Sequence, residues 1–270
     1  MPDVTICIPA WQAEAFIART LGCARAQTHQ GIRILVSIDQ SDDATESICR
    51  ALARDDPRIE VIAQSERLGW SENANFLMRQ VETEYFFLYF HDDLIEPTYV
   101  SALHAALEAR PDAMSAHCDL EKFGNEERIE TGAACDGAAD RRLITYLVQE
   151  TKGPLLRGLT RRAAIDAGLS FPDIAGNGNW RVPPFALRLL AAGPALYVPR
   201  TLYRRWMRDG SLTRTWAPAS AQALIDGQRQ CAALCLAIID GIDASEQEKD
   251  AVRFCLGVRM MIRTRAADAV

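Results

Sequence analysis

The feature that most constrains the fold of this chain is the regular alternation of apolar runs and amphipathic segments over residues 1–118. The apolar runs show almost no polar alternation, which is typical of parallel strands buried on both faces. The predicted strands cover residues 4–8, 32–38, 58–63, 85–90 and 113–118, and the predicted helices cover residues 14–26, 43–54, 71–81 and 96–109. This order predicts an α/β fold with a doubly wound, mostly parallel sheet flanked by helices.

The pattern is looser after residue 118. The sequence predicts a loop or weak strand over residues 125–140 and a loop over 171–184. It predicts helices over 141–150, 161–167 and 186–192, and short strands over 155–160 and 196–199. Two long amphipathic segments, 222–240 and 246–267, predict a C-terminal helical extension. They are expected to complete the core; a homodimer contact and docking on a membrane-bound acceptor are the alternatives.

Composition excludes several classes of protein. The chain has 270 residues and a formal net charge of −6, which argues against a nucleic-acid partner. No apolar run approaches the ~20 residues of a transmembrane segment, and no basic stretch with an apolar core marks a secretory signal. The eight cysteines are scattered, as expected of buried, reduced thiols. A cytoplasmic location is therefore expected, with a peripheral position at the membrane left open.

An acidic pair, Asp92 and Asp93, follows the predicted strand over residues 85–90. In doubly wound sheets, ligands bind beyond the carboxyl ends of the strands. Neighbouring carboxylates there suit a hard divalent cation such as Mg²⁺ or Mn²⁺, which would clamp a diphosphate and neutralise charge on a leaving group. The alternative is that Asp93 only caps the following turn.

Three further segments lie at the same predicted edge. Asp39 follows the second strand, where a carboxylate can accept hydrogen bonds from a uracil imide or a ribose hydroxyl. Pro9 and Trp11 follow the first strand, where a flat indole can line a nucleoside pocket. Gly69 opens a helix whose amides can face a phosphate. For each segment the alternative is an ordinary structural role in a loop or a helix cap.

Taken in order, these segments resemble the family-two glycosyltransferases, which have the GT-A fold. The matching segments are Ile8-Pro9-Ala10-Trp11-Gln12, Ile38-Asp39-Gln40-Ser41-Asp42-Asp43-Ala44-Thr45, Gly69-Trp70-Ser71 with Asn75, and Phe90-His91-Asp92-Asp93 with Pro97. The resemblance covers about residues 3–118 and extends more loosely to 187–193 and 203–204.

The resemblance implies a role for each matching residue. Asp39 would contact the nucleotide base, and Asp92 would hold the metal on the diphosphate. The other expected nucleotide-binding residues are Pro9, Trp11, Asn75 and Asp93. The resemblance also implies a GT-A domain over residues 1–215, with a nucleotide-binding half (1–118) and an acceptor half (119–215), and then a C-terminal helical segment (216–270).

Two departures from the family pattern bear on the chemistry. Phe90 replaces the first acid of the metal motif, although Asp92 keeps the usual ligand. The late acidic pair that supplies the general base falls near Arg181 and Val182, and neither side chain accepts a proton in that role. Inverting transfer needs a base for the acceptor hydroxyl, and Asp173 is the best candidate by position. Arginines within residues 203–208 either cover the diphosphate when a loop closes or form a solvated basic segment.

The expected function is metal-assisted, inverting transfer of a sugar from a UDP- or dTDP-type donor to a sugar or lipid-linked acceptor, in cell-surface polysaccharide or glycoconjugate synthesis. The alternative is a catalytically silent relative that binds a nucleotide sugar but lacks the general base. A nucleotidyltransferase is disfavoured. That class places a Gly-rich, basic loop after the first strand, whereas residues 9–14 contain no glycine and no basic residue.

Overall fold

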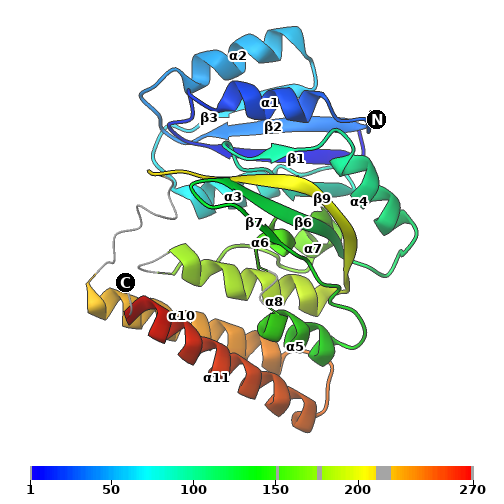
Figure 1. Ribbon diagram of the computed structural model, residues 1–270, viewed down its shortest axis with the longest axis vertical. Helices are drawn as coiled ribbons and strands as arrows, with labels where there is room; N and C mark the ends of the chain where they lie inside the picture. The colour runs from blue at the N-terminus through cyan, green and yellow to red at the C-terminus, as the bar shows by residue number, and fades with distance from the viewer. Residues whose placement is uncertain (1, 150–151, 175–177, 211–219, 269–270) are drawn as a thin grey trace.

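The computed structural model describes residues 2–149, 152–174, 178–210 and 220–268. Its strands form one sheet in the order β3-β2-β1-β4-β8-β6-β9-β5, with β7 paired to β6. Helices flank the sheet, and the last two helices lie together at the end of the molecule away from β1 and β2 (Figure 1). The predicted α/β fold, with a mostly parallel sheet flanked by helices, is confirmed.

The parallel part of the sheet is formed by the first four strands, β1 (Val4–Ala10), β2 (Ile32–Ile38), β3 (Ile59–Ala63) and β4 (Tyr85–Leu88). β1 pairs in parallel with both β2 and β4, and β2 pairs in parallel with β3. The helices of this half are α1 (Ile17–Arg25), α2 (Thr45–Asp55), α3 (Trp70–Arg79) and α4 (Tyr99–Glu108). Each of these elements lies in or close to its predicted range.

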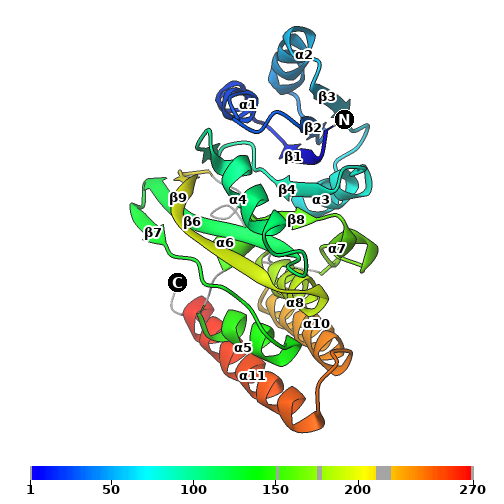
Figure 2. The same ribbon diagram turned by 90° about the vertical axis from the view of Figure 1, so that its right-hand side faces the viewer.

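The strands bury both faces, as their lack of polar alternation predicts. Ile6 and Ile8 of β1 belong to the core that includes side chains of α1, α2 and α4. Cys7, between them, belongs to a second core that includes side chains of α3. Successive side chains of a strand point to opposite faces, and Figure 2 shows α1 and α3 on opposite sides of β1.

The second half of the sheet mixes antiparallel and parallel pairings. Its strands are β5 (Leu94–Ile95), β6 (Ser115–Gly124), β7 (Arg128–Glu130), β8 (Leu159–Arg161) and β9 (Ala195–Met207). β7 lies within residues 125–140, for which a loop or weak strand is predicted. The sequence predicts only a short strand over residues 196–199, but β9 runs for 13 residues in parallel with β6. The pairing skips Pro199 and Arg200, so the proline sits in a bulge, where its missing N–H interrupts no ladder hydrogen bond.

Two other expectations for this half are wrong. The strand predicted over residues 155–160 begins as helix α6 (Lys152–Leu156), and only β8 is extended. The loop predicted over residues 171–184, of which 175–177 lie outside the described residues, contains the short 3-10 helix η1 (Gly178–Arg181). Helix α8 (Val182–Ala192) begins within this predicted loop, four residues before the helix predicted over 186–192. The two prolines at the start of α8 occupy its first turn, where proline is favoured because the N–H there needs no helical partner.

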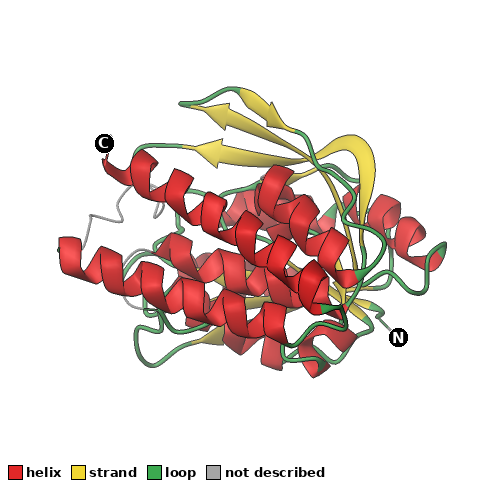
Figure 3. Ribbon diagram, turned by 90° about the horizontal axis from the view of Figure 1, so that it is seen from below, coloured by secondary structure: helices red, strands yellow, loops and turns green. Residues whose placement is uncertain are grey.

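The remaining helices are α5 (Ala139–Gln149), α7 (Ala163–Asp166), α10 (Ala221–Asp240) and α11 (Glu246–Asp268). Figure 3 shows the two long C-terminal helices side by side, and their apolar residues share one core with α3, α5 and α8. The domain boundary predicted at residue 215 lies in a segment, 211–219, outside the described residues. No helix in the described part of the chain is long and apolar enough to span a bilayer.

Asp56 connects α1, α2 and the start of β3. Its carboxylate accepts hydrogen bonds from Arg58 Nη2 and Nε (2.7 and 2.9 Å) and from Arg25 Nε (3.1 Å). The Arg58 hydrogen bonds hold the pKa of Asp56 well below its ordinary value. Because both arginines are about a third exposed, we expect Asp56→Asn to lower the free energy of unfolding by about 1–2 kcal/mol at pH 7, measured by urea denaturation.

The same ion pair has a defined pH dependence. Since the folded pKa of Asp56 is lowered, the stabilisation is present above the ordinary pKa of 3.8 and is lost as the pH falls through the folded pKa. The free energies of unfolding of wild type and of Asp56→Asn should therefore become more similar as the pH falls below 3.8. Asp55→Asn makes the same charge change at an exposed neighbour and should have little effect. An equal loss in both variants at pH 7 would contradict this account.

Candidate functional site

Acidic residues from two loops lie at the carboxyl edge of the parallel strands. Asp39 follows β2, and Asp92 and Asp93 follow β4. β1 lies between these strands, so the backbones of β2 and β4 are about 10 Å apart, two strand spacings. The N–H groups of Asp39 and Tyr89 both donate to β1 carbonyls at 2.8 Å. The structure therefore brings the backbones of the three predicted aspartates to one rim of the sheet.

The loop after β1 is held against the loop after β2. The N–H groups of residues 12–14 donate in turn to side-chain oxygens of Ser41 (3.1 Å), Thr45 (2.7 Å) and Asp43 (3.0 Å). Gln12 has a φ of 47°, a left-handed conformation that a non-glycine residue adopts only when its surroundings hold it. The turn over residues 41–45 thus orders the segment expected to border the nucleoside pocket.

Asp39 is buried, and both of its carboxylate oxygens have partners. They accept hydrogen bonds from the N–H groups of Leu68 (2.7 Å) and Gly69 (2.9 Å) and an ion-paired hydrogen bond from Arg67. The Arg67 guanidinium also stacks 3.8 Å from the centroid of the Trp11 ring. Asp39 and Trp11 are therefore connected through Arg67, a residue that no sequence motif marks.

Asp93 points into the protein, where its side chain is 2% exposed. It accepts hydrogen bonds from Arg157 Nε (3.1 Å), the Tyr203 hydroxyl (2.9 Å) and the Trp206 N–H (3.3 Å). Burial raises the pKa of Asp93, and the charge of Arg157 opposes this rise. The Arg157 guanidinium also lies 4.8 Å from the centroid of the Phe90 ring. Asp93 thus fastens the turn after β4 to β9, and its role as a supporting nucleotide-binding residue stays a prediction.

Asp92 is the member of the pair that remains at the rim. Its side chain is 16% exposed, and its Oδ2 atom lies 3.3 Å from both Nε and Nη2 of Arg208. Arg208 in turn lies over the Phe16 ring, 4.2 Å from its centroid. The carbonyl of Pro9 accepts a hydrogen bond from the His91 ring (3.2 Å), which ties the loop after β1 to the turn that carries Asp92.

The residues at this rim fit a hard divalent cation. Mg²⁺ is usually held by one or two carboxylates, with phosphate and water oxygens in the other positions. Asp92 offers such a carboxylate, and its pairing with Arg208 means that this position already accommodates positive charge. Asp93 is committed to Arg157, and Phe90 has no donor atom. Asp92 would therefore be the ligand that the acidic pair supplies.

A cluster of aromatic and arginine side chains borders Asp92. Trp206 meets Phe16 edge-on at 5.2 Å and stacks with Phe123 at 6.1 Å, measured between ring centroids. The Arg19 guanidinium lies 4.7 Å from the centroid of the Trp206 ring, and Arg204 lies 4.9 Å from that of Phe123. Arg204 and Arg205, which belong to the basic segment at residues 203–208, lie on β9. Because Phe16 and Phe123 are far from Trp206 in sequence, no local pattern marks this cluster.

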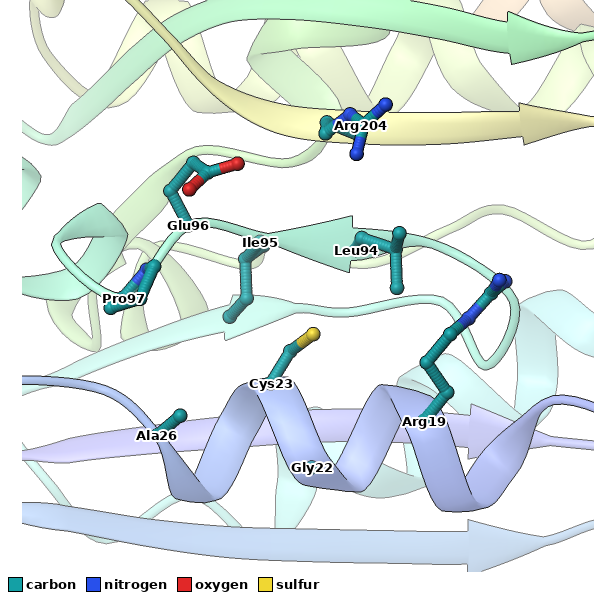
Figure 4. Close-up of a pocket in the computed structure, with 9 residues that line it drawn as sticks. All are labelled: Arg19, Gly22, Cys23, Ala26, Leu94, Ile95, Glu96, Pro97 and Arg204. Atoms are coloured by element: carbon teal, nitrogen blue, oxygen red, sulfur yellow. The ribbon is translucent and has the colours of Figure 1, made fainter.

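A cavity of about 480 Å³ adjoins the cluster. It lies between α1, β5 and β9, and Figure 4 shows Cys23 on α1 pointing toward β5. Arg19 and Arg204 contribute positive charge to its lining, and Glu96 contributes negative charge. The other lining residues are Gly22, Cys23, Ala26, Leu94, Ile95 and Pro97. Because β5 follows Asp93 directly, this opening lies close to the acidic rim.

Asn75, on α3, is connected to the segment that carries Asp173. The Asn75 side chain exchanges two hydrogen bonds with the backbone of Phe171 (2.9 and 2.8 Å), so it holds the segment that leads to Asp173. The Asp173 side chain is fully exposed, and Arg181 lies 3.7 Å from it.

The fold of this chain occurs in solved glycosyltransferases. Staphylococcus aureus TarS, in complex with UDP-GlcNAc, superposes with a TM-score of 0.76 at 17% identity, over 94% of this chain and 70% of that one. Mannosyltransferase PcManGT from Pyrobaculum calidifontis, in complex with GDP-Man and Mn²⁺, superposes with a TM-score of 0.63 at 16% identity, over 100% of this chain and 76% of that one. The fold is therefore that of the GT-A class of glycosyltransferases.

Sequence comparison narrows the class. Glycosyltransferase GlyA from Streptococcus pneumoniae is 27% identical over 238 residues, which are 84% of this chain and 34% of GlyA, so the chain spans about a third of that relative's length. The family model described as glycosyl transferase family 2 matches residues 5–154. Since this match covers more than half of the 270 residues, the chain belongs to glycosyl transferase family 2.

Proposed function

We propose that this chain transfers a sugar from a nucleotide-diphosphate donor to a hydroxyl acceptor. The proposal rests on one observation: Asp39 and Asp92 follow the strands on either side of β1 and lie on the same rim of the sheet. The ordered loop after β1 lies beside them. The solved relatives with this fold contain UDP-GlcNAc in one case and GDP-Man with Mn²⁺ in another, which supports a nucleotide-sugar donor. We assign the donor to the UDP or dTDP type.

The nucleoside would bind between Asp39 and Trp11. Asp39 is buried at the end of β2, where it can accept a hydrogen bond from a base imide. Arg67 occupies the space between the two residues and is itself 36% exposed, so it can swing outward and leave the indole and the carboxylate to the base. Pro9 would border the same pocket from β1, and Asn75 would support it indirectly by fixing residue 171.

The diphosphate would lie at Asp92. A Mg²⁺ or Mn²⁺ ion held there would neutralise the charge that develops on the leaving nucleotide diphosphate. Arg208 is the counter-ion of Asp92 and is placed to contact a phosphate once the carboxylate binds the cation. Asp93 contributes by holding β9, and therefore Arg208, against the rim.

The proton of the acceptor hydroxyl would be taken by Asp173, in an inverting, in-line attack. Its exposed carboxylate is open to an acceptor, and the Asn75 contacts with Phe171 anchor its segment.

One observation favours a second candidate function, a catalytically silent nucleotide-sugar-binding relative. Arg181 and Val182 stand at the start of α8, where the family pattern places its acidic pair.

Calorimetric titration tests the donor proposal. We expect UDP or dTDP to bind in the presence of Mn²⁺ and to bind at least about 10-fold more weakly after the metal is chelated, since one lost charge-assisted contact is worth 1.4 kcal/mol or more. GDP serves as the comparison for base selectivity. Failure of all three nucleotides to bind, with and without Mn²⁺, would remove the basis for the transferase proposal.

The proposals for the acceptor and the assembly rest on composition and on the exposed surface. A sugar or lipid-linked hydroxyl is the expected acceptor, and the formal charge of −6 argues against nucleic acid. Exposed apolar side chains on α10 and α11, among them Leu236 and Phe254, are compatible with a homodimer, which light scattering would detect. The cytoplasmic location, with peripheral membrane contact, stays a prediction.

A further inference from the structure

Asp3, His29 and His104 come together at the amino end of β1, the end opposite to the rim of Asp39 and Asp92. Asp3 immediately precedes β1, His29 precedes β2, and His104 lies on α4. β1 has seven residues, so about 20 Å of strand separates the two ends. The proposed transferase site uses none of these three residues.

The donor atoms of the three side chains are close together. One carboxylate oxygen of Asp3 lies 2.8 Å from Nε2 of His29, and the other lies 3.3 Å from Nε2 of His104. One ligand atom from each residue can be chosen so that all three lie within 4.8 Å of one another. Tetrahedral Zn²⁺, with bonds of about 2.0–2.1 Å, keeps its ligand atoms about 3.3 Å apart. Small side-chain rotations would therefore bring all three atoms onto one ion.

The ligand types indicate which ion would bind. Two imidazole nitrogens with one carboxylate suit Zn²⁺ and its transition-metal neighbours, whereas Mg²⁺ and Ca²⁺ prefer oxygen ligands. The side chains of His29 and His104 are 17% and 19% exposed, and that of Asp3 is 40% exposed. This exposure leaves one side open for entry of the ion and for a water ligand.

The surrounding structure holds the three residues in place. The Asp3 N–H donates to the carbonyl of Gly31, and the Asp3 carbonyl accepts from the N–H of Tyr85, both at 2.9 Å. A Cβ atom at Gly31 would collide with the Asp3 carboxylate, so glycine at this position leaves room for the carboxylate beside the histidines. The Tyr85 ring packs edge-on against His104, with 4.9 Å between ring centroids.

We infer that Asp3, His29 and His104 form a binding site for a transition-metal ion of the Zn²⁺ type, separate from the cation site at Asp92. The ion clamps the start of β1, the segment before β2 and helix α4. It therefore stabilises the nucleotide-binding half from the edge remote from the chemistry. This inference does not depend on the transferase proposal.

Titration of the untagged chain with Zn²⁺ in the absence of nucleotide tests the site. We expect one ion to bind, and saturating Zn²⁺ to raise the melting temperature by roughly 5 °C through preferential binding to the folded state. His104→Gln, His29→Gln and Asp3→Asn keep the size and a hydrogen-bonding group but remove a ligand. Each should weaken Zn²⁺ binding by at least about 100-fold, more than the loss of an outer-sphere partner causes.

Two controls locate the ion. Asp92→Asn should bind Zn²⁺ as tightly as wild type. Co²⁺ in place of Zn²⁺ should give visible absorption bands without a near-ultraviolet thiolate band, because none of the three proposed ligands is a cysteine; a thiolate band would place the ion on one of the eight cysteines instead. Circular dichroism in the presence of a metal chelator tests whether each variant is folded without the ion. Absence of Zn²⁺ and Co²⁺ binding to wild type, or equal affinity in wild type and the folded variants, would overturn the inference and leave the three side chains as an ion-pair cluster.

Discussion

Replacement of Asp92 by asparagine is expected to lower the rate of sugar transfer by on the order of 100- to 1000-fold, the usual loss when a charge-stabilising group is removed from an active site. Asparagine keeps the shape of the side chain but removes the carboxylate that would hold the cation on the diphosphate. The Mn²⁺-dependent part of nucleotide binding should be lost with it. Hydrolysis of the donor sugar is the rate to measure while the acceptor is unidentified, together with calorimetric binding of UDP with and without Mn²⁺.

The control for this experiment is Asp166→Asn, which removes the same charge from an ion-paired and largely exposed position on α7. It should leave both hydrolysis and binding near wild-type values. Hydrolysis in Asp92→Asn that stays within about 10-fold of wild type would contradict the assignment of Asp92. Wild-type chain that binds nucleotide through Asp92 but hydrolyses no donor would instead support the silent relative.

Replacement of Arg157 by methionine is expected to lower the free energy of unfolding by about 3–5 kcal/mol, because it leaves the charge of buried Asp93 without its ionic partner. Both side chains are nearly inaccessible, at 8% and 2% exposure, so water cannot take the place of the guanidinium. The corresponding fall in melting temperature is roughly 10 °C for a chain of this size. Urea denaturation and thermal unfolding followed by circular dichroism measure the two quantities.

A double variant separates the ion pair from simple loss of packing. Adding Asp93→Asn to Arg157→Met removes the unpaired charge, so the double variant should be more stable than Arg157→Met alone. Arg162→Met, at an exposed arginine paired with Asp166, is the matched control and should change stability by less than about 1 kcal/mol. Equal stability of the single and double variants would mean that the loss comes from packing and not from the buried charge.

The parallel half of the sheet could be predicted from the sequence because its signals are local. Largely apolar runs such as Ile32–Ile38 have few alternatives to a strand covered on both faces, and the second and fourth runs lead to acidic residues at the same rim. The antiparallel half could not be predicted in the same detail. β9 continues past Pro199 only because it pairs with β6 through a bulge, and β8 is a three-residue strand held between β4 and β6.

The sequence by itself determined the α/β order, the family resemblance and the rim on which Asp39 and the acidic pair would lie, since these follow from short-range patterns and strand direction. The resemblance already assigned the cation to Asp92, but only the tertiary structure decided what surrounds each acid of the pair. Asp93 is committed to Arg157, Tyr203 and the Trp206 N–H, while Asp92 stays at the surface with Arg208. Adjacent aspartates are equivalent in a local pattern, and they become different only when residues more than 60 positions away pack against one of them.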